Sequence, residues 1–293
     1  MKKSPLMPPE TYAAGFRRFL PVYPAVLLLL GLTYFFALRS AFEYDIGHFT
    51  PSLLFGLLVF FTIAGVLASA VPAWLARYTI SVTDTPSGNL CSLFASVMTA
   101  VLAVILTIDS VLLFTPDTTM VSKLEVFTLP FLAVSALLPN RYARIRQLTS
   151  IVSVISVNLT MFSCYFDPYV PINSPVRNLT VIMQAAVLLF LLSEARISFG
   201  AKSFRITVPF YVFSCGTCAA LGGGIALGGL LNRLLTVQPS DPNLSALRLG
   251  LYLALAVLAL SRLAVLPGIC GKYTEPPKKE PEKAESAGES SIT

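Results

Sequence analysis

Residues 52–75 read SLLFGLLVFFTIAGVLASAVPAWL, a stretch that contains no Asp, Glu, Lys or Arg. A helix needs about 20 apolar residues to cross the hydrocarbon core of a bilayer, which is roughly 30 Å thick. Within lipid, every backbone N–H and C=O must find its hydrogen-bond partner inside the segment or in a closed barrel. This stretch therefore predicts a transmembrane helix.

Similar apolar stretches recur along the chain. The sequence lacks the weak alternating segments of about ten residues that are typical of a transmembrane β-barrel. Together they predict an all-α polytopic transmembrane bundle of about eight spans. The fourth span is the weakest, because it is short, contains Pro130 and begins beside Lys123 and Glu125. The predicted spans are 20–38, 52–75, 91–114, 122–139, 148–166, 178–195, 206–231 and 246–268.

The composition agrees with a membrane protein. Hydrophobic residues make up 55% of the chain and charged residues only 12%, against about 25% charged residues in a typical soluble domain. The net charge of +6 fits basic loops on the cytoplasmic side of a membrane better than nucleic-acid binding. The expected partner is the lipid bilayer, and no nucleic acid is expected.

The basic residues also predict the orientation. If both termini lie in the cytoplasm, 16 of the 21 Lys and Arg residues face it, as expected for a multi-pass protein of the cell membrane. Without the fourth span, the basic loop that carries Arg141, Arg144 and Arg146 would face outward, which the charge rule disfavours.

Two segments flank the spans. Tyr12, Phe16, Phe19 and Leu20 share one helical face, which fits either a short helix on the inner leaflet or a cytoplasmic extension of the first span. Residues 271–293 are rich in Pro, Glu, Lys and Ser, and a segment of this composition cannot bury enough apolar surface to fold. They predict a disordered cytoplasmic tail after a transmembrane domain at residues 1–270.

Asp109 stands in the outer third of the third span. An ionisable side chain at that depth usually faces the bundle interior or a water-filled cavity, so Asp109 is a candidate cation or proton site. The alternatives are that it reaches water at the interface or pairs with Arg39 or Arg177.

Three further polar residues lie in or beside apolar spans. Glu194, at the inner end of the sixth span, is expected to pair with Arg141, Arg144 or Arg146, which favours a structural ion pair over a gate. Asn158 and Gln184 lie deeper in their spans. Hydrogen bonds between helices are the usual role of such amides, and contact with a solute is the alternative.

The seventh span carries a face of small residues at Gly216, Ala220, Gly224 and Gly228. Such a face lets another backbone approach closely, within the chain, in a second copy of this protein or in another membrane protein. Each glycine also weakens a helix by about 1 kcal/mol relative to alanine, so a bend or a break at a binding site is the alternative.

The C-x-x-C pair formed by Cys215 and Cys218 lies near mid-membrane, where buried thiols are inert.

Several chemistries are disfavoured by the sequence. The single histidine, His48, excludes zinc sites with several His ligands, and no Walker A motif or H-E-x-x-H is present. We therefore expect no catalytic residue, no metal, no cofactor and no enzymatic activity.

Three short stretches carry a family resemblance: Tyr165–Asp167, Pro171–Pro175 and Ser193–Arg196. They resemble the signature region of an uncharacterised family of multi-pass membrane proteins from Gram-positive, often anaerobic, bacteria. The similarity covers about 35 residues, around 165–196. It implies a bacterial cytoplasmic membrane and a helical fold, and it implies no activity.

Two functions remain open from the sequence. The first is a non-catalytic sensor, assembly factor or accessory protein, favoured by the absence of any chemical motif. The second is a permease for a small solute or ion that uses Asp109, Asn158, Gln184 and the glycine-rich seventh span.

Overall fold

The structure, a computed structural model, describes residues 9–43, 47–76, 80–82, 90–114, 120–138, 142–166, 174–199, 207–235 and 244–272. It confirms the predicted all-α polytopic bundle, because seven of its helices are long and apolar enough to cross a membrane. The predicted tail lies almost entirely outside the described residues. The helices of the bundle are α2 (Val22–Ser40), α3 (Leu53–Ala76), α4 (Leu90–Leu112), α5 (Met120–Leu137), α6 (Ala143–Tyr165), α7 (Pro175–Ser198), the seventh span with α8 (Thr207–Thr217), η2 (Cys218–Gly222) and α9 (Gly223–Leu235), and α10 (Ala246–Ile269).

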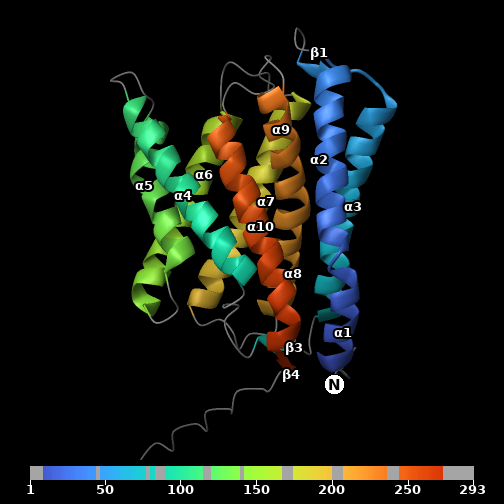
Figure 1. Cartoon of the computed structure of the whole chain (residues 1–293), viewed down its shortest axis with the longest axis vertical. Coiled ribbons are helices and arrows are strands. Elements are labelled where there is room, and N and C mark those ends of the chain that lie inside the picture. The colour runs from blue at the N-terminus through green and yellow to red at the C-terminus, as the bar shows by residue number, and fades with distance from the viewer. Residues whose placement is uncertain are drawn as a thin grey trace, which may run out of the picture.

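Helix α5 corresponds to the weak fourth span. It has 18 residues with Pro130 inside, it is not among the seven long apolar helices, and it packs between α4 and α6 (Figure 1). Successive helices run in alternating directions along the bundle, so the N-terminal helix and the end of α10 lie at the same end (Figure 1). This arrangement matches an even number of crossings. We call the end with the N-terminal helix the inner end, following the charge rule.

The N-terminal helix α1 (Pro9–Phe19) continues the first span across a turn at Leu20 and Pro21. Its aromatic face is covered by protein, since Tyr12 and Phe16 are buried and α1 contacts α3 and α10. The Tyr12 hydroxyl donates a hydrogen bond to the carbonyl of Pro72 in α3 at 3.2 Å. The segment is therefore an extension of the first span whose apolar face packs on the bundle and is not left for a lipid leaflet.

Two short antiparallel ladders close the ends of the bundle. At the outer end, β1 (Phe42–Glu43) pairs with β2 (His48–Phe49), and Gly47 in the connection has a φ of 69°, a conformation that glycine adopts without strain. At the inner end, β3 (Ile80–Val82) pairs with β4 (Cys270–Lys272). This second ladder ties the connection after α3 to the end of α10.

The seventh span forms the core, with 83% of its most apolar window buried. The small-residue face packs against helices of the same chain. A Cβ added to Gly228 would lie 2.6 Å from the carbonyl oxygen of Gly31 in α2, and one added to Gly216 would lie 2.7 Å from Ser69 Oγ in α3. Ala220 is fully buried. The small-residue face is therefore covered by helices of the same chain.

The glycine-rich span is also continuous. Its glycines produce no break, and the only irregularity is the π-helical turn η2, in which the helix accommodates an extra residue. The close contacts with α2 and α3 explain this, because they compensate for the low helix propensity of glycine.

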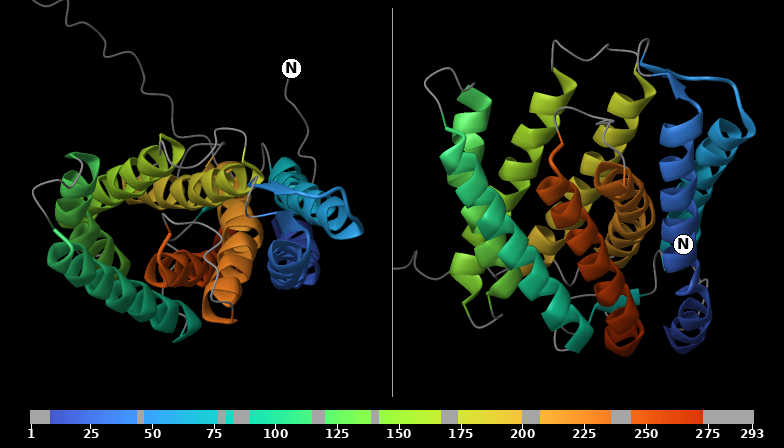
Figure 2. Two further views of the ribbon diagram at one scale, coloured as in Figure 1. Left: turned by 90° about the horizontal axis from the view of Figure 1, so that it is seen from above. Right: turned by 45° about the horizontal axis from the view of Figure 1, so that its top comes forward.

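Five helices surround a common interior. In sequence order α4, α5, α6 and α7 each pack on the next, and α10 packs against α4 on one side and against η2, α9 and α7 on the other. The view from above shows α10 inside the curve formed by α4, α5, α6 and α7 (Figure 2). We call the side-chain-filled interior between these five helices the seam, and it holds most of the buried charge.

Candidate functional site

The outer half of the seam holds a buried ion pair. Glu125 of α5 accepts a hydrogen bond from Arg248 of α10 at 3.0 Å. The other oxygen of the Glu125 carboxylate accepts a hydrogen bond from the Thr160 hydroxyl of α6 at 2.5 Å. Glu125 is only 3% exposed. The contact joins three helices across the seam, and we call Glu125, Thr160 and Arg248 the outer cluster.

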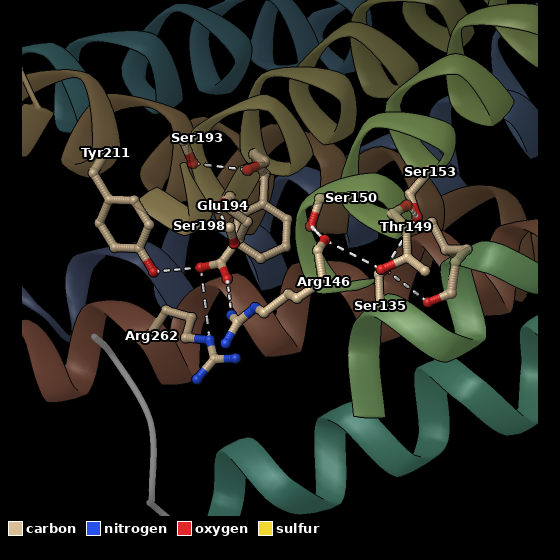
Figure 3. Close-up of polar contacts among 12 residues, drawn as sticks. Ser135, Arg146, Thr149, Ser150, Ser153, Ser193, Glu194, Ser198, Tyr211 and Arg262 are labelled. Atoms are coloured by element: carbon tan, nitrogen blue, oxygen red, sulfur yellow. Dashed lines mark hydrogen bonds and ion pairs between the residues drawn. The ribbon is translucent and has the colours of Figure 1, made fainter. Parts of the chain in front are cut away.

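The inner half of the seam holds a second cluster, centred on Glu194 of α7 (Figure 3). The Tyr211 hydroxyl of α8 donates a hydrogen bond to Glu194 Oε1 at 2.6 Å. The Arg146 guanidinium of α6 lies 3.4 Å from Oε2, and Arg262 Nε of α10 lies 3.7 Å from Oε1. We call Arg146, Glu194, Tyr211 and Arg262 the inner cluster.

One of the arginines predicted to pair with Glu194 does so, and a further arginine pairs with it as well. Of the three predicted arginines, Arg146 pairs with Glu194, the Arg144 side chain is exposed, and Arg141 lies outside the described residues. Sequence reasoning missed Arg262 and Tyr211. Arg262 had a signal, because it is an ionisable residue inside an apolar span, whereas nothing in the sequence distinguishes Tyr211 from other aromatic residues.

One face of α6 connects the two clusters. Residues about one or two helical turns apart line up on the same side of a helix, and between Arg146 and Thr160 this side carries hydroxyls. Most donate to the carbonyl one turn back, as Ser153 does to Thr149 at 2.7 Å, while Ser153 also contacts Ser135 of α5 at 3.0 Å. Among the described residues, Ser156 Oγ has no hydrogen-bond partner. The hydroxyl face consists of Thr149, Ser150, Ser153, Ser156 and Thr160, all of them buried.

Helix α10 contributes an arginine to each cluster. Arg248 and Arg262 are separated by about four helical turns, roughly 21 Å along the axis, and lie on nearly the same side of the helix. Most of a bilayer core therefore lies between the two clusters, and α10 carries both charges into it.

A small internal cavity adjoins the inner cluster. Its volume is about 30 Å³, and its polar lining includes Ser135, Arg146, Ser150, Ser153 and Glu194. A cavity of this size and polarity can hold one water molecule. The inner end of the seam is thus closed by side chains, with space for a single bridging water.

A larger pocket lies at the outer end of the bundle, between α4, α9 and α10. Its volume is about 220 Å³, and it is lined by Leu106, Asp109, Ser110, Leu113, Arg233, Ser245 and Arg248. Asp109 is half-buried here. No ion pair within the described part of the chain joins it to Arg39 or Arg177, the two partners considered from the sequence.

The two amides differ in position. Gln184 of α7 is fully buried, donates a hydrogen bond to Cys164 Sγ at 3.3 Å and lies beside Tyr252 of α10, so it belongs to the outer half of the seam. Asn158 lies on the other side of α6 from the hydroxyl face, about 150° around the helix axis from the centre of that face. Its Oδ1 atom is buried and has no hydrogen-bond partner among the described residues.

Comparisons with protein-family models, with curated proteins and with solved structures found no match to this chain. The resemblance of residues 165–196 to a family of bacterial membrane proteins stays a prediction.

Metal and thiol chemistry find little support in the described residues. Across these ranges no three His, Cys, Asp or Glu side chains converge in a way that could hold a metal ion. Cys215 and Cys218 are free thiols buried in the core, away from the water that thiol exchange requires. The clusters of the seam are the strongest chemical feature of this part of the chain.

Proposed function

We propose that this protein is a permease for a small solute, located in the cytoplasmic membrane of a bacterium, and that the seam is its transport path. The observation that carries the proposal is the placement of the two ion-pair clusters at opposite halves of one seam, with a hydroxyl face between them. Intramembrane charges usually mark the path of a substrate or an ion.

A purely structural role accounts poorly for this arrangement. Buried ion pairs contribute little net stability, because desolvating two charges offsets their attraction. Apolar side chains would fill the same space as well. Five charged residues in one seam are therefore better explained by a need for contacts that break and re-form.

The contacts themselves suggest gates. The outer cluster joins α5, α6 and α10, and the inner cluster joins α6, α7, α8 and α10, so both must part before a solute can pass. The inner ion pairs are long, at 3.4 and 3.7 Å, whereas the outer ion pair is close, at 3.0 Å. With both clusters formed, the proposed path is closed at both ends.

Reaction of cysteines with a charged, water-soluble thiol reagent tests this proposal in reconstituted vesicles. Ser153→Cys would place a thiol halfway along the seam, in a background where Cys91 and Cys270 are replaced by serine. A permease should expose this thiol to reagent added on either side during its cycle. Native Cys164, beside Gln184, should react as well, from the outer side.

The same chain provides the controls. Cys215 and Cys218 in the core should stay unmodified, and their labelling would reveal unfolding. Ile151→Cys on the lipid-facing side of α6, where Ile151 is 43% exposed, should not react, because thiolate formation requires water. If Ser153→Cys is as inert as Cys215, the seam is a static core, and an accessory role becomes the better proposal.

A further inference from the structure

The outer pocket is lined by residues of both charges. Helix α4 contributes Asp109 and Ser110 to its lining, while α9 contributes Arg233 and α10 contributes Arg248. A solute that fits this pocket has to present a positive group to α4 and a negative group to the arginines.

The two arginines are held in place by other partners. Arg233 donates to the carbonyl oxygen of Leu244 through Nε at 3.2 Å and through its terminal nitrogen at 2.9 Å. Arg248 is held by Glu125. Asp109 makes no ion pair within the described residues, although two arginines line the same pocket. The lining of this pocket of about 220 Å³ therefore combines one carboxylate with two arginines that are held by other groups.

We propose that this pocket binds a small zwitterion of the amino-acid type. Asp109 receives the ammonium group, Arg233 and Arg248 receive the carboxylate, and the hydroxyls of Ser110 and Ser245 complete the polar contacts. The volume suits a molecule smaller than a typical drug, whose pockets measure about 300–1,000 Å³. That this zwitterion is the transported solute rests on the proposed permease function.

Arg248 links this pocket to the outer cluster. Arg248 lines the pocket, and its guanidinium pairs with Glu125, so a carboxylate bound by Arg248 competes with Glu125. Binding then weakens the contact that joins α5 to α10 and favours opening of the outer half of the seam. Arg248 therefore couples ligand binding in the pocket to opening of the outer cluster.

Thermal unfolding of the purified full-length protein tests the binding site. The probes are the common amino acids, each at millimolar concentration, followed by the N-acetyl and amide derivatives of the best binder. We expect at least one amino acid to raise Tm by about 5 °C when it is nearly saturating. Both derivatives should have little effect, because each lacks one of the two charges.

Variants assign the site. Asp109→Asn and Arg233→Gln should each weaken binding of that amino acid at least tenfold, whereas Glu43→Gln removes an exposed outer carboxylate and should leave binding unchanged. The proposal is overturned if no amino acid raises Tm, if the derivatives bind as well as the parent, or if Asp109→Asn keeps full affinity. The derivatives decide the matter even if a variant does not fold.

These outcomes are separate from those of the thiol experiment. If Ser153→Cys reacts but no amino acid binds, the zwitterion proposal is rejected and the permease proposal stands. If an amino acid binds but Ser153→Cys does not react, the binding site stands and the protein is better described as a solute receptor.

Discussion

At the scale of single residues, the buried charges are sustained only by their partners. Moving an isolated ion into a medium of low polarity is far more unfavourable than leaving it in water. Glu125 and Arg248 meet this requirement together, with Thr160 satisfying the second carboxylate oxygen. The same holds for Glu194, which is contacted by a tyrosine and two arginines.

The outer pair gives a prediction about stability. Glu125→Leu leaves the Arg248 charge buried without its carboxylate, and we expect the free energy of unfolding to fall by about 3–5 kcal/mol. The double variant Glu125→Leu/Arg248→Met removes both charges and should recover most of that loss. Unfolding of the detergent-solubilised protein by denaturant measures both. Equal losses in the single and double variants would show that the pairing contributes nothing.

At the scale of elements, contact between α2 and the seventh span depends on glycine. Gly31 and Gly228 allow the two backbones to approach so closely that any side chain at Gly228 would meet the carbonyl oxygen of Gly31. Hydropathy predicted the position of the seventh span but gave no information about its neighbour. The small-residue face indicated a close helix contact without indicating whether the partner was α2 or another protein.

A pair of alanine substitutions in this one span tests the contact. Gly228→Ala should destabilise the protein by about 1–3 kcal/mol, because a clash with backbone cannot be relieved by a rotamer change. Gly222→Ala, whose Cβ would meet its nearest neighbour at 3.5 Å, should have no unfavourable effect. Thermal unfolding of the two variants compares them directly. A Gly228→Ala protein as stable as Gly222→Ala would contradict the packing described for α2.

At the scale of the whole molecule, the alternation of the helices puts α1 and the end of α10 at one end of the bundle (Figure 1). The excess of Lys and Arg predicts that this end faces the cytoplasm. The assignment depends on α5 crossing the membrane, because one missing span would reverse α6 and every later helix.

Labelling of single cysteines in intact cells tests the topology. Cysteines at Thr118, before α5, and at Ser245, before α10, should react with an impermeant reagent added outside. A cysteine at Asn140, between α5 and α6, should react only after the cells are opened. Reaction of the Asn140 variant in intact cells would mean that α5 does not cross and would invert the second half of the chain.

The sequence alone determined the helical class and the position of most apolar spans, and it predicted the orientation, because these depend on local hydropathy and on the charges beside each span. Only the tertiary structure decided which polar residues meet. Glu125 and Arg248 are 123 residues apart, and Glu194 finds Tyr211 and Arg262 on two other helices. These contacts depend on how each helix is rotated and on which helices lie beside it. Close packing at small residues determines both, and hydropathy does not.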